Sequence, residues 1–185
     1  AEVIATVFTV TVGCVSFSGS IITFLKLQEL MTTRPVIFPF GRQLIALTLI
    51  GVLASGGWVI SSGGSTPLLV NGLLSLLFGI LFVLPVGGAD VPIVISLLNA
   101  FTGLTVAASG YVLQTTLLIV AGTLVGASGT ILTRLMAEAM GRSLFGTLFG
   151  AFTAKAQAST GAVDARPVKS GSPDDVAILL NYAQR

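Results

Sequence analysis

Long apolar runs alternate with short polar breaks along most of this chain. Five runs rich in Leu, Ile, Val and Ala approach the roughly 20 helical residues that cross a hydrocarbon core of about 30 Å. Because backbone groups in lipid must be hydrogen-bonded internally, runs of this length form helices. The sequence therefore predicts transmembrane helices at 3–25, 44–60, 68–85, 91–113 and 116–136.

The pattern changes after the fifth run. An apolar, Gly-broken stretch and a linker rich in Ala, Ser, Thr and Gly cover 144–172. The Ser-Pro-Asp-Asp segment at 172–175 is typical of a helix start, with a capping Ser, an early Pro and early acids. We expect a transmembrane domain over 1–143, an interfacial segment and linker over 144–172, and the truncated start of a soluble domain at 173–185.

Composition favours the same fold class. Of the 185 residues 54% are hydrophobic and only 9% are charged, whereas a soluble domain carries roughly 25% charged residues. Between Arg42 and Arg134, Asp90 is the only Asp, Glu, Lys or Arg. The expected fold is an all-α polytopic membrane bundle of about five helices, with a polar C-terminal linker and a short soluble helix.

The basic residues indicate the orientation of this bundle. Lys26, Arg34 and Arg42 flank the first break, and further basic residues follow the fifth run. Because short basic loops remain on the cytoplasmic side, we expect the first loop, the loop at 87–92 and the C-terminal tail there. The net charge of +2 then reflects topology and does not indicate binding to nucleic acid.

The residue types exclude several chemistries. The chain has no His and a single cysteine, Cys14, which excludes an internal disulfide and ordinary zinc sites. No nucleophile–base pair and no phosphate-binding Gly loop is found in the sequence. We therefore expect no catalytic residue, no metal and no bound cofactor in this chain.

Small and hydroxyl residues recur at helical spacing in three of the runs. Such residues let helix backbones approach closely and bond across helices. The positions expected to pack helices are Gly13, Ser16, Ser20, Gly103, Gly122 and Gly126. For the hydroxyl stripe of the first run a second interpretation stays open, in which it lines a hydrated path.

A few polar residues are candidates for function. The Asn99 amide, which hydrocarbon cannot satisfy, either bonds another helix or orients a proton path; Asn71, nearer the opposite membrane face, receives less weight. Asp90 either caps the fourth helix, with Pro92 in its first turn, or places a carboxylate at the cytoplasmic mouth of that path. Glu2, on the opposite side, is either an interface charge or a proton entry group.

One long segment resembles a known family. Residues 87–99, Gly-Gly-Ala-Asp-Val-Pro-Ile-Val-Ile-Ser-Leu-Leu-Asn, are similar to the loop-and-helix signature of the membrane domain of proton-translocating NAD(P) transhydrogenases. The segments 17–20 and 125–132, followed by Lys26-Leu27 and by 139–143, also resemble that family. The similarity spans nearly the whole chain, in order.

The resemblance implies a function. This chain would be the C-terminal part of the beta-subunit membrane domain plus, at 173–185, the first helix of the NADP(H)-binding domain. It would conduct protons while hydride passes between NADH and NADP+ on other domains. The implied partners are the lipid bilayer, the remaining membrane helices, the alpha subunit, the NAD(H)- and NADP(H)-binding domains, and a second copy in a homodimer. The implied location is a bacterial plasma membrane or the mitochondrial inner membrane.

The resemblance also implies roles for single residues. Asp90 and Asn99 would belong to the proton and coupling pathway. Ser128 and Gly129 would lie on the helix face that transmits the coupling, and Arg142 at the junction with the NADP(H) domain. The family's intramembrane His is absent, and Ala-Ser stands at 127–128 where many members have two serines. The competing class is a non-enzymatic helical scaffold or small transporter subunit, in which the polar stripes only pack.

Overall fold

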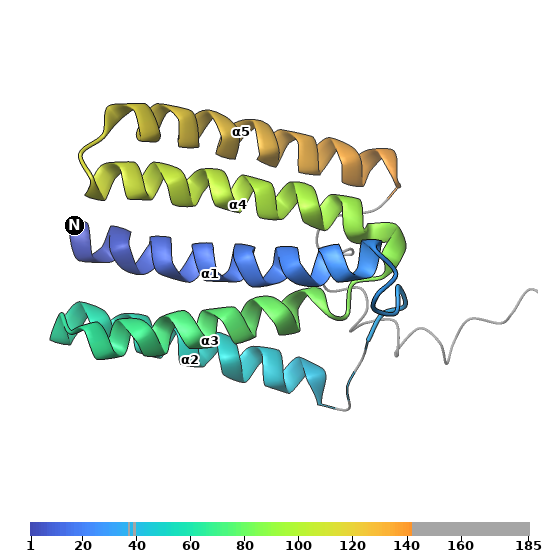
Figure 1. Ribbon diagram of the computed structural model, residues 1–185, viewed down its shortest axis with the longest axis horizontal. Coiled ribbons are helices and arrows are strands. Elements are labelled where there is room, and N and C mark those ends of the chain that lie inside the picture. The colour runs from blue at the N-terminus through green and yellow to red at the C-terminus, as the bar shows by residue number, and fades with distance from the viewer. Residues whose placement is uncertain (37, 39, 142–185) are drawn as a thin grey trace, which may run out of the picture. The chain divides into compact units, whose positions relative to one another are not determined.

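The computed structural model describes residues 1–36, 38 and 40–141. These ranges contain five long α-helices, a short 3-10 helix and no strand (Figure 1). The bounds are α1 Glu2–Leu27, α2 Gly41–Ser62, α3 Ser65–Val83, η1 Gly88–Asp90, α4 Val91–Val112 and α5 Thr116–Ala139. All five α-helices are long and apolar enough to cross a membrane, which confirms the predicted polytopic helical bundle.

The helices lie side by side in the order α5, α4, α1, α3, α2 (Figure 1). α1 is central and packs on α3 and on α4, while α5 packs on α4 and α2 packs on α3. The end of α1, the end of α3 and the start of α4 meet at one end of the bundle. We call this the loop end, because it carries the segments 28–36 and 84–90; the far end carries Glu2 and the α4–α5 turn.

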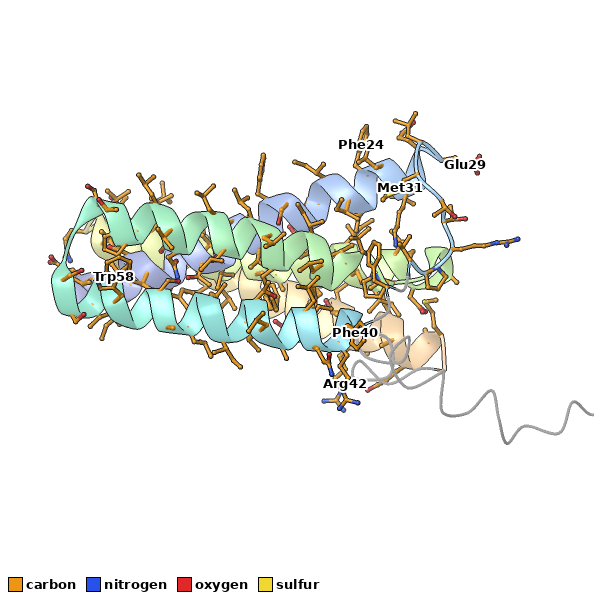
Figure 2. The ribbon with its side chains drawn as sticks, turned by 90° about the horizontal axis from the view of Figure 1, so that it is seen from below. Phe24, Glu29, Met31, Phe40, Arg42 and Trp58 are labelled. Atoms are coloured by element: carbon orange, nitrogen blue, oxygen red, sulfur yellow. The ribbon has the colours of Figure 1, made fainter. Side chains whose placement is uncertain are left out.

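The outer surface of the helices is apolar. Large side chains such as Phe17, Leu53 and Leu124 are more than half exposed, a surface suited to hydrocarbon rather than to water. Figure 2 shows Glu29 and Arg42 at the loop end and Trp58 near the far end. Charges at one end and an aromatic ring near the other are typical of a bundle whose ends lie at the membrane interfaces.

The helix ends differ slightly from the sequence expectation. α2 begins at Gly41 rather than at 44, and α3 begins at Ser65 rather than at 68 and ends at Val83, before Pro85. The first turns of α2 and α3 contain Gly, Arg, Ser and Thr. A prediction from hydropathy alone therefore places the start of these two helices too late in the sequence. Arg142, the linker predicted at 144–172 and the helix predicted at 173–185 lie outside the described residues.

Candidate functional site

α4 and α5 approach each other at glycine positions. A Cβ atom on Gly103 would collide with the backbone of Gly126, and one on Gly122 with the backbone of Ala107. A Cβ on Gly129 would lie 3.0 Å from the Cα of Ala100. Because backbone meets backbone along this contact, the two helices form a tight pair that offers no room for a path between them.

A groove runs along one side of the contact between α1 and α4. The groove has a volume of about 310 Å³ and is lined by Gly13, Ser16, Phe17, Ser20, Thr102, Thr105 and Val106. Four of these seven residues carry a hydroxyl group. The packing stripe predicted on α1 therefore lines an open groove over part of its length.

The hydroxyls of Ser16 and Thr102 share their hydrogen bonds. Ser16 Oγ donates to the Leu98 carbonyl at 2.8 Å, Thr102 Oγ1 donates to the same carbonyl at 2.9 Å, and the two hydroxyl oxygens lie 2.7 Å apart. Two hydroxyl protons thus serve three contacts. One contact always lacks a proton, so either hydroxyl can turn and bond the other, and each keeps lone pairs to accept a further proton.

The other two groove hydroxyls, those of Thr105 and Ser20, can hydrogen-bond a further molecule. Thr105 Oγ1 donates to the Phe101 carbonyl at 2.9 Å and keeps its acceptor capacity. Ser20 is exposed, and its hydroxyl makes no hydrogen bond to any part of the chain that the structure describes. The exposed lining of the groove is mainly apolar, and these hydroxyls are the places in it at which a water molecule can form hydrogen bonds.

The two intramembrane asparagines are in opposite environments. Asn71 is fully buried: its Oδ1 accepts from Thr11 at 2.9 Å, and its Nδ2 donates to the Val52 carbonyl and the Ser55 hydroxyl, each at 3.1 Å. This network ties α1, α2 and α3 together. Asn99 is exposed on α4 and makes no side-chain hydrogen bond within the described residues.

The exposed amide has a physical consequence. Hydrocarbon offers no partner to an amide, so the α4 face that bears Asn99 must meet water or a polar group from outside the described residues. Asn99 precedes Thr102 by three positions and therefore lies beside it on the helix surface. The open asparagine is thus next to the hydroxyl groove.

Asp90 occupies the N-cap position of α4, as one sequence interpretation expected, but its carboxylate makes no capping hydrogen bond to that helix. The residue is 8% exposed and ends η1, where its backbone N–H donates to the Gly87 carbonyl at 2.9 Å. Beside it a cavity of about 400 Å³ is bordered by Lys26, Leu27, Glu29, Thr33, Gly88, Ala89 and Val91. The residues on either side of Asp90 therefore border an open space at the loop end.

The other sequence candidates are dispersed. Ser128 is exposed on α5 and donates to the Val125 carbonyl at 3.2 Å, while its neighbour Gly129 is buried against α4. Glu2 is exposed in the first turn of α1 at the far end, opposite Asp90. The structure thus gathers four hydroxyls at one groove, with Asn99 three residues before Thr102 on the same helix, and it separates Glu2 and Ser128 from Asp90.

Lys26 is a residue whose environment the sequence did not indicate. In the sequence, Lys26 is one of the basic residues that flank the first loop, whereas in the structure its side chain is 1% exposed. Its Nζ donates to the carbonyls of Leu84 at 2.6 Å, Val86 at 2.7 Å and Val83 at 3.4 Å. The signal that could have found it is its spacing of three residues from buried Thr23, on the inner face of α1.

No group of three or more His, Cys, Asp or Glu side chains in the described ranges is placed to hold a metal ion. The polar groups that the structure brings together at the groove are the hydroxyls of Ser16, Ser20, Thr102 and Thr105. These groups can bind water and transfer protons.

Comparison with known proteins identifies the family. The model of the NAD(P) transhydrogenase beta subunit family matches residues 1–185. The chain is 39% identical over 176 residues to the NAD(P) transhydrogenase subunit beta of Rhodospirillum rubrum, in an alignment covering 94% of this chain and 38% of the relative. A second sequence of this subunit from the same species matches equally. The chain therefore spans well under half the length of these relatives, and it belongs to the NAD(P) transhydrogenase beta-subunit family.

Proposed function

We propose that this chain forms part of the proton path of a transhydrogenase, in which proton passage across the membrane is coupled to hydride transfer between NADH and NADP+. The observation that carries the proposal is the hydroxyl-lined groove between α1 and α4, with Asn99 beside it. Family membership and five membrane-crossing helices support it. The nucleotides would bind to other parts of the enzyme.

The groove has room for several water molecules. Its volume is about 310 Å³, whereas a water molecule occupies about 30 Å³ of the liquid. Ser16 and Ser20 are four residues apart on α1, which is about 6 Å along the axis and too far for a direct hydrogen bond. Waters must therefore bridge successive hydroxyls.

A proton would pass through this column without ionising a side chain. A hydroxyl accepts a proton on a lone pair and releases its own to the next oxygen, so each transfer leaves it neutral. The shared contacts of Ser16 and Thr102 favour this proton transfer, because each hydroxyl proton has two alternative acceptors. Asn99, which does not ionise either, would orient the water beside Thr102.

The ends of the path would be acidic. Glu2 at the far end and Asp90 at the loop end are separated by the length of the helices. Asp90 would link the path to the nucleotide-binding part of the enzyme, which we place on the loop side. Binding or release of NADP(H) would change which side the groove can reach, a coupling of two sites through two states.

The exposed face of α4 implies partners. The remaining membrane helices of the enzyme would cover Asn99, and the alpha subunit would complete the assembly, with a second copy of the whole unit forming a homodimer. Ser128 on α5 and Arg142 would lie on the route of the coupling. The membrane would be a bacterial plasma membrane or the mitochondrial inner membrane.

The test removes the shared hydroxyls. The double variant Ser16→Ala/Thr102→Val preserves side-chain volume closely and deletes both donors. In the assembled enzyme, reconstituted in vesicles, we expect proton pumping and coupled hydride transfer to fall at least about tenfold. This is less than the roughly 10²–10⁴-fold contributed by a positioned acid or base, because water can still enter the groove. Nucleotide binding should persist.

The control is Ser75→Ala, which removes a buried hydroxyl that only bonds the Asn71 carbonyl within α3. This variant should pump normally. Normal pumping by the groove double variant would show that the hydroxyls only pack.

A further inference from the structure

Lys26 is bound entirely to one short segment of the chain. Its three hydrogen bonds go to the carbonyls of Val83, Leu84 and Val86, all of which are buried. A lysine ammonium has three N–H donors, so all of them are used. This segment leads through η1 directly into Asp90 and α4.

The charge of Lys26 matches the position that it occupies. Val83 and Leu84 form the C-terminal end of α3, where the last carbonyls have no partner in their own helix and the helix dipole is negative. A cation from a neighbouring helix satisfies both the hydrogen bonding and the dipole. Lys26 therefore ties the end of α1 to the end of α3 through a buried side chain.

A second set of contacts holds the same segment from the other side. The Val36 N–H donates to the Leu84 carbonyl at 3.2 Å, and the Gly88 N–H donates to the Thr33 carbonyl at 2.8 Å. Gly88 is close to Thr33, because a Cβ at this position would lie 3.1 Å from the Thr33 Cβ. The segment 84–88 is thus held by hydrogen bonds both to α1 and to the connection that follows α1.

We propose that Lys26 is a positioning residue for Asp90, which it acts on by fixing the 84–90 segment through the carbonyls of Leu84 and Val86. The inference deepens the proposed function, on which it rests for the role of Asp90 in coupling. When Lys26 releases these carbonyls, the start of α4 is free to shift relative to α1. The groove between α1 and α4 then changes with it.

The experiment follows the loop and the transport separately. In the assembled enzyme with Cys14→Ser and its other cysteines replaced, a reporter cysteine is placed at exposed Ala89, beside Asp90. Lys26→Met keeps the length of the side chain and removes its donors. We expect this variant to raise the labelling rate of the cysteine at 89 by a membrane-impermeant maleimide at least fivefold, and Lys26→Arg, which keeps donors and charge, to restore most of the protection.

A second reporter distinguishes loop movement from unfolding. Gln114 is exposed in the turn at the far end, so a cysteine there should react equally in all variants. Gly88→Ala provides an independent displacement, because the added Cβ presses on Thr33 while Lys26 stays intact. This variant too should increase labelling at 89, and it covers the case in which Lys26→Met does not assemble.

The number of protons pumped per hydride transferred is a measurement that would not change if Lys26 had a purely structural role. Without the reporters, Lys26→Met should pump fewer protons per hydride transferred, by at least threefold per assembled enzyme, and Lys26→Arg should recover the ratio. Unchanged labelling at 89 in Lys26→Met overturns the positioning role, and unchanged labelling in Gly88→Ala shows that the 84–88 segment does not control access to position 89. An unchanged proton-to-hydride ratio in Lys26→Met overturns its link to coupling. Failure of the proposed function is a distinct result, since the groove double variant would then pump normally.

Discussion

The hydroxyl oxygens of Ser16 on α1 and Thr102 on α4 lie 2.7 Å apart and both bond the Leu98 carbonyl. This contact joins two helices whose sequence positions differ by 86 residues. It leaves one proton too few for its hydrogen bonds, in a groove that the hydroxyl-bearing residues Ser20 and Thr105 also line. The predictions below follow from this groove and from the residues around it.

Asn99 and Asn71 should respond in opposite ways to replacement by Leu. Asn99→Leu removes an exposed amide that holds no bond within the described residues, so assembly should persist while proton pumping falls at least about tenfold. Asn71→Leu removes a bonded amide and should destabilise the bundle by about 1–2 kcal/mol, with pumping per assembled enzyme retained. Pumping by reconstituted vesicles and thermal unfolding in detergent measure the two effects. Normal coupled turnover of Asn99→Leu would mean that this residue only packs.

Neutralising Asp90 should uncouple the enzyme. Asp90→Asn keeps the size of the side chain but removes the carboxylate at the loop end, so coupled hydride transfer should slow, or fewer protons should be pumped per hydride, with assembly intact. The matched control is Glu138→Gln on α5, whose carboxylate takes part in an exposed 2.8 Å ion pair with Arg134. Exposed pairs contribute little, so the control should pump within about twofold of the parent. Unchanged pumping by Asp90→Asn would contradict the account.

The contact between α4 and α5 should tolerate no added volume. Gly122→Ala places a methyl group against the backbone of Ala107, and the forced separation should cost about 1–3 kcal/mol. Gly57→Ala on α2 is the control, since nothing lies within 4 Å of the added Cβ; it should be neutral or stabilise the helix by up to about 1 kcal/mol. The midpoint of thermal unfolding in detergent compares the two. Equal midpoints would show that α4 and α5 are not held at backbone contact.

The helices and their glycine-bearing faces could be predicted from the sequence, because the length of an apolar run and the helical spacing of its glycines are local properties. Gly122, Gly126 and Gly129 are all buried against α4, as their spacing suggested. The two asparagines could not be told apart in this way. Both lie in apolar runs, and only the arrangement of neighbouring helices buries Asn71 and leaves Asn99 open.

Lys26 shows a second limit of the sequence. A lysine at the end of an apolar run normally marks a cytoplasmic loop, and its partners lie 57 to 60 residues further along the chain. No local pattern links residues at that separation. Asp90 shows a third limit of the sequence. Its N-cap position could be predicted, but the lack of a side-chain capping hydrogen bond to α4 depends on the geometry of η1.

The central claim is that protons cross along the groove between α1 and α4. The most direct measurement places a cysteine at Ser20, in the groove, and in a second protein at Leu53, on the apolar surface of α2. Both are treated with a small charged methanethiosulfonate reagent in vesicles, with Cys14 replaced. The account predicts that the Ser20→Cys protein reacts and loses proton pumping, while the Leu53→Cys protein does neither. A Ser20→Cys protein that stays unreactive, or that pumps normally once labelled, would contradict a proton path along this groove.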